Sequence, residues 1–70
     1  VTFIYAFVIT AANAYYNKAV CYGFQGDVDS AIIWLQKAID LSPGEYREMA
    51  KTDSDFDAIR SDPRFQALLH

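Results

Sequence analysis

Residues 12–43 read ANAYYNKAVCYGFQGDVDSAIIWLQKAIDLSP, and this stretch decides the fold. In its first part, Tyr15, Ala19 and Tyr22 recur at intervals of four and three residues, which is the period of an α-helix. In its second part, apolar residues fall on one stripe of a helix, while the charged residues lie mostly off that stripe. The stretch therefore predicts two packed helices, and the stripe of the second consists of Ala31, Ile32, Leu35, Ala38 and Ile39.

Turn and cap residues place the ends of the second helix. Gly26 and Asp27 form a turn followed by an acidic N-cap, whose carboxylate accepts hydrogen bonds from the free amides of the next turn. We expect the helix to run from about Val28 to Leu41. It ends at Ser42, because Pro43 disfavours helical geometry in the residue before it. A connection of about four residues favours two adjacent, antiparallel helices.

The remainder, from Gly44 onward, consists of short segments. Residues 45–51 predict a helix of two turns. Thr52, with Asp55 three residues later, is typical of a capping box and opens a short turn that reaches Arg60. Asp62 followed by Pro63 is a strong signal for a helix start. The predicted fold class is therefore all-α: an antiparallel helix-turn-helix followed by two or three short capping helices.

The segment from Val1 to Asn17 carries no acidic or basic side chain other than tyrosine phenols, whereas nine acids and five bases follow from Asp27 onward. Its clean apolar stretch, residues 1–12, is shorter than the roughly 20 residues of a membrane-spanning helix. We expect residues 1–11 to be an extension of the first helix, a hydrophobic cap or foreign sequence. The end of a transmembrane or signal segment over residues 1–12 stays open as the alternative.

Composition excludes several classes of function. The chain has 70 residues, a net charge of −3 and one cysteine, so it is a single small domain without an internal disulfide. The acidic balance argues against nucleic-acid binding, which needs a clustered basic face. The sequence contains no phosphate-binding glycine loop and no catalytic motif, so we expect no enzymatic activity and no cofactor. We expect Cys21, in the first helix, to be a buried, inert thiol.

Alternating acids at Asp53, Asp55 and Asp57 match the start of a calcium-binding EF-hand loop. Such a loop then needs a glycine and, at its twelfth residue, a bidentate glutamate. Ala58 and Arg64 occupy those two positions. We therefore interpret the acids as helix caps and solvated side chains, and predict no metal site.

Residues 12–43 resemble one tetratricopeptide repeat. That family's pattern places an aromatic residue, an apolar and a small residue, and a tyrosine on the first helix, then an alanine, an aromatic residue and a proline. Lys18 departs from the pattern, which prefers a leucine-like residue, although a lysine stem can lie along apolar surface. The residues at the corresponding positions here are Tyr15, Lys18, Ala19, Tyr22, Ala31, Leu35 and Pro43.

The resemblance implies a non-catalytic protein–protein interaction or scaffold module. In this family the first helix of a repeat lines a concave groove that holds an extended peptide or a partner helix. The resemblance also implies that Asn17 stands where some members hold a peptide backbone or a terminal carboxylate. The residues carried over to the groove are Asn13, Tyr16, Asn17, Val20 and Phe24.

The C-terminal stretch of residues 50–69, AKTDSDFDAIRSDPRFQALL, resembles segments that close some tetratricopeptide arrays, which implies the C-terminal end of a longer array. We therefore divide the chain into an apolar extension (1–11), a repeat (12–43) and capping helices (44–70). The expected partners are a protein or peptide, or neighbouring repeats; self-association and membrane contact through residues 1–12 stay open. The sequence does not fix a compartment, although it favours the cytoplasm over a membrane-associated location.

Overall fold

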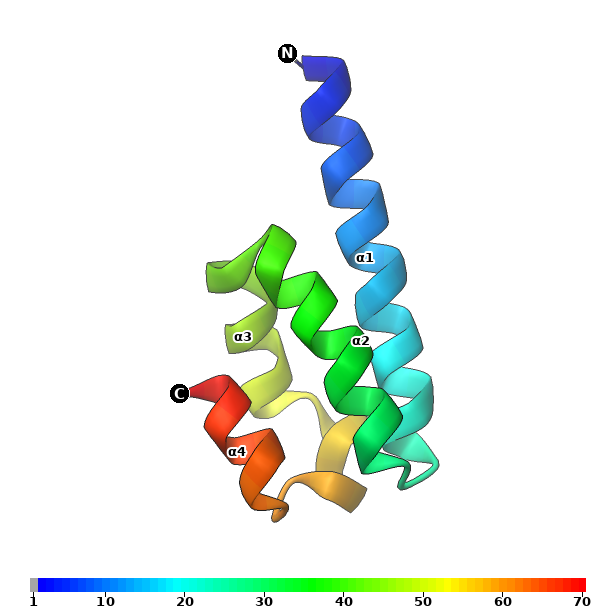
Figure 1. The fold of residues 1–70 in the computed structure, drawn as a ribbon, viewed down its shortest axis with the longest axis vertical. Helices are drawn as coiled ribbons and strands as arrows, with labels where there is room; N and C mark the ends of the chain where they lie inside the picture. Colours follow the sequence, from blue (N-terminus) through cyan, green and yellow to red (C-terminus); the bar gives the residue numbers. More distant parts are fainter. Residues whose placement is uncertain (1) are drawn as a thin grey trace.

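The computed structural model describes residues 2–70 of the chain. Val1, the first residue of the expected extension, lies outside the described residues. Within Thr2–His70 every regular element is helical, and Figure 1 shows a long first helix beside four shorter elements. The elements are α1 (Thr2–Phe24), α2 (Val28–Leu41), α3 (Pro43–Thr52), η1 (Ser54–Ile59) and α4 (Pro63–Leu69). The predicted all-α fold is confirmed.

Helices α1 and α2 form an antiparallel pair joined by a tight turn (Figure 1). Ala12, Ala19, Ala31 and Ala38 are all fully buried. Methyl side chains let two helix backbones approach closely, so these small residues explain the tight pairing. The turn needs Gly26, whose φ of 82° is in the left-handed region that glycine adopts without strain.

Two of the predicted helix starts are confirmed. The Asp27 carboxylate accepts a hydrogen bond from the backbone N–H of Ser30 at 3.1 Å, and α2 has the bounds that the sequence predicts. The Asp62 carboxylate accepts from the backbone N–H of Arg64 at 2.8 Å, with Pro63 in the first turn of α4. Each carboxylate satisfies an amide that has no partner inside its helix.

The predicted capping box at Thr52 is wrong. Thr52 is the last residue of α3, because the N–H of Asp53 still bonds to the carbonyl of Met49 at 3.1 Å. The cap of the next element is Asp53, whose carboxylate accepts from the backbone N–H of Asp55 at 3.0 Å. An aspartate readily bonds to the backbone two residues onward, so this short turn prevails over the box.

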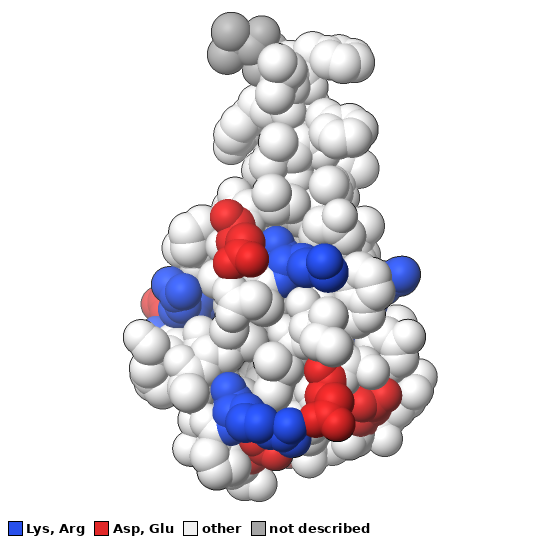
Figure 2. Space-filling model, in the orientation of Figure 1, with Lys and Arg blue, Asp and Glu red and all other residues white. Residues whose placement is uncertain are grey.

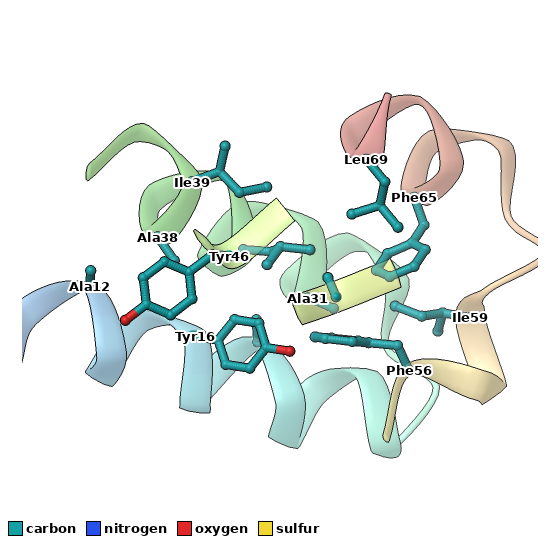
Figure 3. Close-up of a cluster of buried hydrophobic side chains, with 13 residues drawn as sticks. Ala12, Tyr16, Ala31, Ala38, Ile39, Tyr46, Phe56, Ile59, Phe65 and Leu69 are labelled. Atoms are coloured by element: carbon teal, nitrogen blue, oxygen red, sulfur yellow. The ribbon is translucent and has the colours of Figure 1, made fainter. Parts of the chain in front are cut away.

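Elements α3, η1 and α4, which together form the tail, cover one side of the helix pair. Helix α3 packs on α2, η1 packs on α1, and α4 contacts both α2 and α3. Phe56 and Phe65 are the largest fully buried side chains, and their ring centroids lie 5.1 Å apart. Figure 3 shows these rings filling the space between the tail and the alanine-lined helix pair. The tail thus completes the hydrophobic core of the repeat.

The N-terminal half of α1 extends past the end of α2 (Figure 1). Residues 2–11 continue the first helix, which is one of the three alternatives expected for this segment, since α1 runs without a break from Thr2. Its apolar side chains lie in the open, with Phe3 85% and Phe7 70% exposed. Figure 2 shows that blue and red atoms are confined to the wider body below this segment. Over residues 2–70, no helix combines the length and the apolar character that crossing a bilayer requires.

Candidate functional site

A stripe of four side chains runs along the C-terminal part of α1. Asn13, Asn17, Val20 and Phe24 are separated by four, three and four residues, so they share one face of the helix. Both asparagines are exposed, Val20 is half-buried and Phe24 is 73% exposed. We call this set the α1 stripe. These are four of the five residues that the sequence predicts for a groove, and the structure places them together.

Tyr16, the fifth predicted groove residue, does not belong to this surface. Its side chain is only 3% exposed, because it lies between the rings of Tyr46 and Phe56 (Figure 3). The ring centroids are 5.2 Å and 5.8 Å away. The expectation that Tyr16 lines an open groove is therefore wrong for this chain: α3 and η1 cover it.

The Tyr16 hydroxyl is satisfied within the protein. It donates a hydrogen bond of 2.7 Å to the Asp53 carboxylate, at the start of η1. Burial, this hydrogen bond and the negative charge of Asp53 raise the pKa of the Tyr16 phenol above its ordinary value. Burial also raises the pKa of the Tyr46 phenol next to it. Tyr16 therefore anchors the tail to α1.

Gly23 allows η1 to lie against α1. A Cβ atom at this position would come within 2.5 Å of the Phe56 ring and 3.6 Å of Ile59. Real Cβ atoms do not approach a ring so closely, so only glycine fits here without a shift. The close approach puts the acidic outer side of η1 next to the α1 stripe.

A shallow pocket forms where the α1 stripe meets η1. Its volume is about 250 Å³, and Asp55 is the only charged residue in its wall. The pocket therefore combines an apolar floor with one negative edge. The lining residues are Val20, Cys21, Phe24, Gln25 and Asp55.

Cys21 is exposed at this pocket, which corrects the expectation of a buried thiol. The physical reason is its position on the helix. Ala19 and Gly23 face the protein, and Cys21 lies halfway around the helix from them. Exposure alone does not make the thiol reactive, because a thiolate needs an electropositive setting and the charged wall here is a carboxylate.

Arg60 joins the end of α3 to the start of η1. Its guanidinium donates hydrogen bonds to the backbone carbonyls of Ala50 at 3.1 Å, Lys51 at 2.7 Å and Asp53. Its Nε also pairs with the Asp57 carboxylate at 3.2 Å. The carbonyls of Ala50 and Lys51 lie in the last turn of α3, and that of Asp53 opens η1 and also accepts from the backbone N–H of Phe56, so Arg60 caps α3 and fixes the path into η1.

The acidic segment offers no assembled metal centre in the part of the chain that the structure describes. Within residues 2–70, no three histidine, cysteine, aspartate or glutamate side chains gather closely enough to hold an ion. Asp53 caps η1 and Asp57 pairs with Arg60. These contacts agree with the interpretation of the acids as caps and solvated side chains.

Sequence reasoning missed the contribution of the tail to the site. Asp55, Cys21 and Gln25 were not predicted to line it, because only the return of η1 across α1 creates the pocket. One signal was present in the sequence: a glycine at position 23 inside a helical period indicates close approach of another segment.

Comparison with known proteins identifies the helix pair. A family profile described as tetratricopeptide repeat matches residues 12–45, which contain α1 from Ala12, all of α2 and the start of α3. No curated protein and no solved structure gives a significant match.

Proposed function

Because residues 12–45 are a tetratricopeptide repeat, we propose that this protein binds an extended segment of a partner protein along the α1 stripe. Repeats of this family are protein–protein interaction modules and are generally non-catalytic. They present extended concave surfaces for binding. The observation that carries the proposal is the α1 stripe itself, which stays uncovered beside a pocket although Tyr16 on the same helix is buried.

The chemistry of the stripe favours a particular kind of ligand. Asn13 and Asn17 offer both donors and acceptors to a peptide backbone. Val20, Phe24 and the pocket floor suit an apolar side chain. Asp55 at the pocket edge attracts a cation and repels a carboxylate. We therefore assign an extended peptide with a basic residue near its apolar anchor, rather than a terminal carboxylate at Asn17.

The proposal also places this chain at the C-terminal end of an array, where it acts as a scaffold. A stacked repeat leaves an apolar face that its neighbour normally covers, and a terminal segment must cover it at the array's end. Here α3, η1 and α4 bury that face with Tyr46, Phe56 and Phe65. Acidic side chains such as Asp55 and Asp57 remain on the outer surface. Residues 44–70 thus act as the cap and residues 12–43 as the repeat.

Titration of the full chain with a synthetic basic peptide tests this function. Replacing Phe24 by alanine should weaken binding at least about tenfold, because an exposed aromatic anchor carries much of an interface's free energy. The separate variant Asn17→Ala should also weaken peptide binding. Phe7→Ala is the matched control, since Phe7 is also on α1 and is 70% exposed against 73% for Phe24.

The control must bind as the parent does. If Phe24→Ala and Asn17→Ala also bind the peptide as tightly as the parent, the α1 stripe is not the binding surface. A matching peptide with glutamates in place of its basic residues should bind more weakly, because Asp55 would repel it. Equal affinity for both peptides would remove the role given to Asp55.

A further inference from the structure

The first turns of α1 stand clear of the rest of the protein. Residues 3–7 are consecutive and all exposed, and together they make more than one full turn of the helix. Every side of the helix is therefore open here, and large apolar side chains point outward on all of them. Phe3 is 85% exposed, Phe7 70%, and Ile4 and Tyr5 67% each. We call residues 3–11 the projection.

The projection carries little that needs water. Residues 3–11 contain no acidic or basic side chain, and their polar side-chain groups are the Tyr5 phenol and the Thr10 hydroxyl. The Thr10 hydroxyl donates a hydrogen bond of 2.9 Å to the carbonyl of Ala6, one turn earlier on the helix. A helix also satisfies its backbone groups internally beyond the first turn. Transfer of the projection from water to hydrocarbon therefore leaves few polar groups without a partner.

A lipid bilayer covers such a helix more completely than a partner helix does. A helix that is apolar along one stripe buries that stripe against a neighbour, whereas a helix that is apolar on all sides is found inside a large core or a membrane. One partner helix would cover a single side of the projection and leave the other sides in water. Lipid chains surround the projection on every side.

The distribution of charge over the molecule fits the same surroundings. On the face that Figure 2 shows, blue and red atoms lie on the wider body, and the described part of the extending segment has none. Residues 3–11 reach about 14 Å along the helix axis, at about 1.5 Å per residue. That is about half of the roughly 30 Å hydrocarbon core of a bilayer. The first charged residue after the projection is Lys18, about 10 Å farther along the helix, so insertion leaves the charges in water.

Aromatic rings and lysines lie just beyond the projection, at the level that the lipid headgroups would occupy. Tyr15 is about 6 Å past the projection along α1, and its ring centroid lies 5.8 Å from that of Trp34 on α2. The Lys18 and Lys37 Nζ atoms lie 4.1 Å and 5.7 Å from the Trp34 centroid, and both lysines are exposed. Tyrosine and tryptophan are enriched at membrane–water interfaces. Lysine places its stem along apolar surface and its ammonium among the headgroups.

We propose that the projection inserts into the hydrocarbon of a phospholipid bilayer and holds the repeat at the membrane surface. The body stays in water, with Tyr15, Trp34 and the two lysines at the headgroups. The inference is independent of the proposed peptide binding, because the α1 stripe begins at Asn13, beyond the projection. Burial of apolar surface drives the insertion, so it needs no anionic lipid.

Co-sedimentation of the full chain with phosphatidylcholine vesicles measures the insertion. The chain should bind these electrically neutral vesicles, and high salt should not release it, because screening does not weaken apolar burial. Phe3→Asp should weaken vesicle binding at least about tenfold, since a carboxylate in hydrocarbon is costly. Ile33→Asp is the matched control, because Ile33 is also an exposed apolar residue, 55% exposed, but lies on α2. This variant should bind the vesicles as the parent does.

Quenching by lipids that carry bromine near the ends of their acyl chains reports the depth of residue 3. Trp34 is the chain's only tryptophan and lies on the body, so the emission of the bound parent should persist. Phe3→Trp adds a second tryptophan whose emission should fall as the chain binds. Urea unfolding of both Phe3 variants should match that of the parent, because Phe3 is 85% exposed and outside the core.

Three outcomes would overturn the proposal. The first is that the chain does not bind the neutral vesicles, or that salt releases it. The second is equal vesicle binding by Phe3→Asp and the parent, or unquenched emission of the bound Phe3→Trp variant, which would place the contact elsewhere. The third is self-association through residues 3–11 that persists with vesicles present, which would make a second copy the occupant. Peptide binding by the α1 stripe is measured without lipid and stands apart from all three.

Discussion

At Gly23 the backbone of α1 touches the ring of Phe56, and this contact decides where the tail lies. We predict that Gly23→Ala destabilises the protein by about 1–3 kcal/mol, the usual cost of forcing an extra methyl into a packed site. Alanine's better helix propensity, worth about 1 kcal/mol, offsets only part of that cost. Urea unfolding of the full chain measures the change.

Gly44→Ala is the control for this substitution. Gly44 lies in the first turn of α3, and a Cβ atom there would meet nothing within 4 Å. That variant should be unchanged or more stable than the parent. If Gly23→Ala were stabilising in the same experiment, η1 would not lie against α1 at this point.

Tyr16 is the second residue that joins the tail to the repeat, and its phenol makes the contact sensitive to pH. The folded protein raises the phenol's pKa above its ordinary value of 10.0, so folding favours the neutral form. This contribution is fully present below that value and is lost as the pH rises through the raised folded pKa. The parent should therefore lose stability on the alkaline side.

The variant Tyr16→Phe isolates this effect. At neutral pH it should be about 1–3 kcal/mol less stable, because it removes the hydrogen bond to the charged Asp53. Its stability should then fall less steeply above pH 10.0 than that of the parent. Denaturant unfolding at a series of pH values measures both. A variant that keeps the full alkaline loss would show that another group causes it.

At the scale of the elements, α3 ends on the guanidinium of Arg60. We predict that Arg60→Ala destabilises the chain by about 2–3 kcal/mol, since it leaves the part-buried carbonyls of Ala50 and Asp53 without a charged donor. Arg60→Lys should recover only part of this loss, because an ammonium lacks the planar fork that reaches several carbonyls at once. Thermal melting of both variants and of the parent measures the order of their stabilities.

Arg47→Ala serves as the comparison. Arg47 donates a single hydrogen bond of 3.4 Å to the carbonyl of Leu68, so its loss should cost much less. If both alanine variants melted at the same temperature, the capping role of Arg60 would be contradicted.

Local signals in the sequence were sufficient for most element boundaries. Asp27, Pro43 and Asp62 act through hydrogen bonds and backbone restrictions within a few residues, so α2 and the start of α4 could be predicted. The cap at Asp53 was missed because Thr52 and Asp53 are adjacent residues that can both act as the N-cap of the next element. Their backbone conformations decide which of them does so.

The site was predicted less completely than the fold. The α1 stripe follows from helical spacing, which the sequence contains. Tyr16 was misplaced because its burial depends on Asp53 and Phe56, 37 or more positions along the chain. Contacts of that separation leave no periodic signal. For the same reason Asp55 could not be assigned to the pocket.

Across the whole molecule, the repeat has three sides with different roles. The tail covers one side with aromatic residues, the α1 stripe borders it with an acidic edge at Asp55, and Lys18 and Lys37 lie over the Trp34 ring on a third side. The N-terminal half of α1 extends beyond this body without charge, as Figure 2 shows.

Amide chemical-shift mapping of the full chain during titration with the basic peptide tests the proposed binding surface most directly. We predict that the largest shifts fall on Asn13, Asn17, Val20 and Phe24, with Asp55 of η1 moving as the pocket fills. Amides of α2 and of the N-terminal half of α1 should stay in place. Shifts centred on those regions, with the α1 stripe unchanged, would contradict the account.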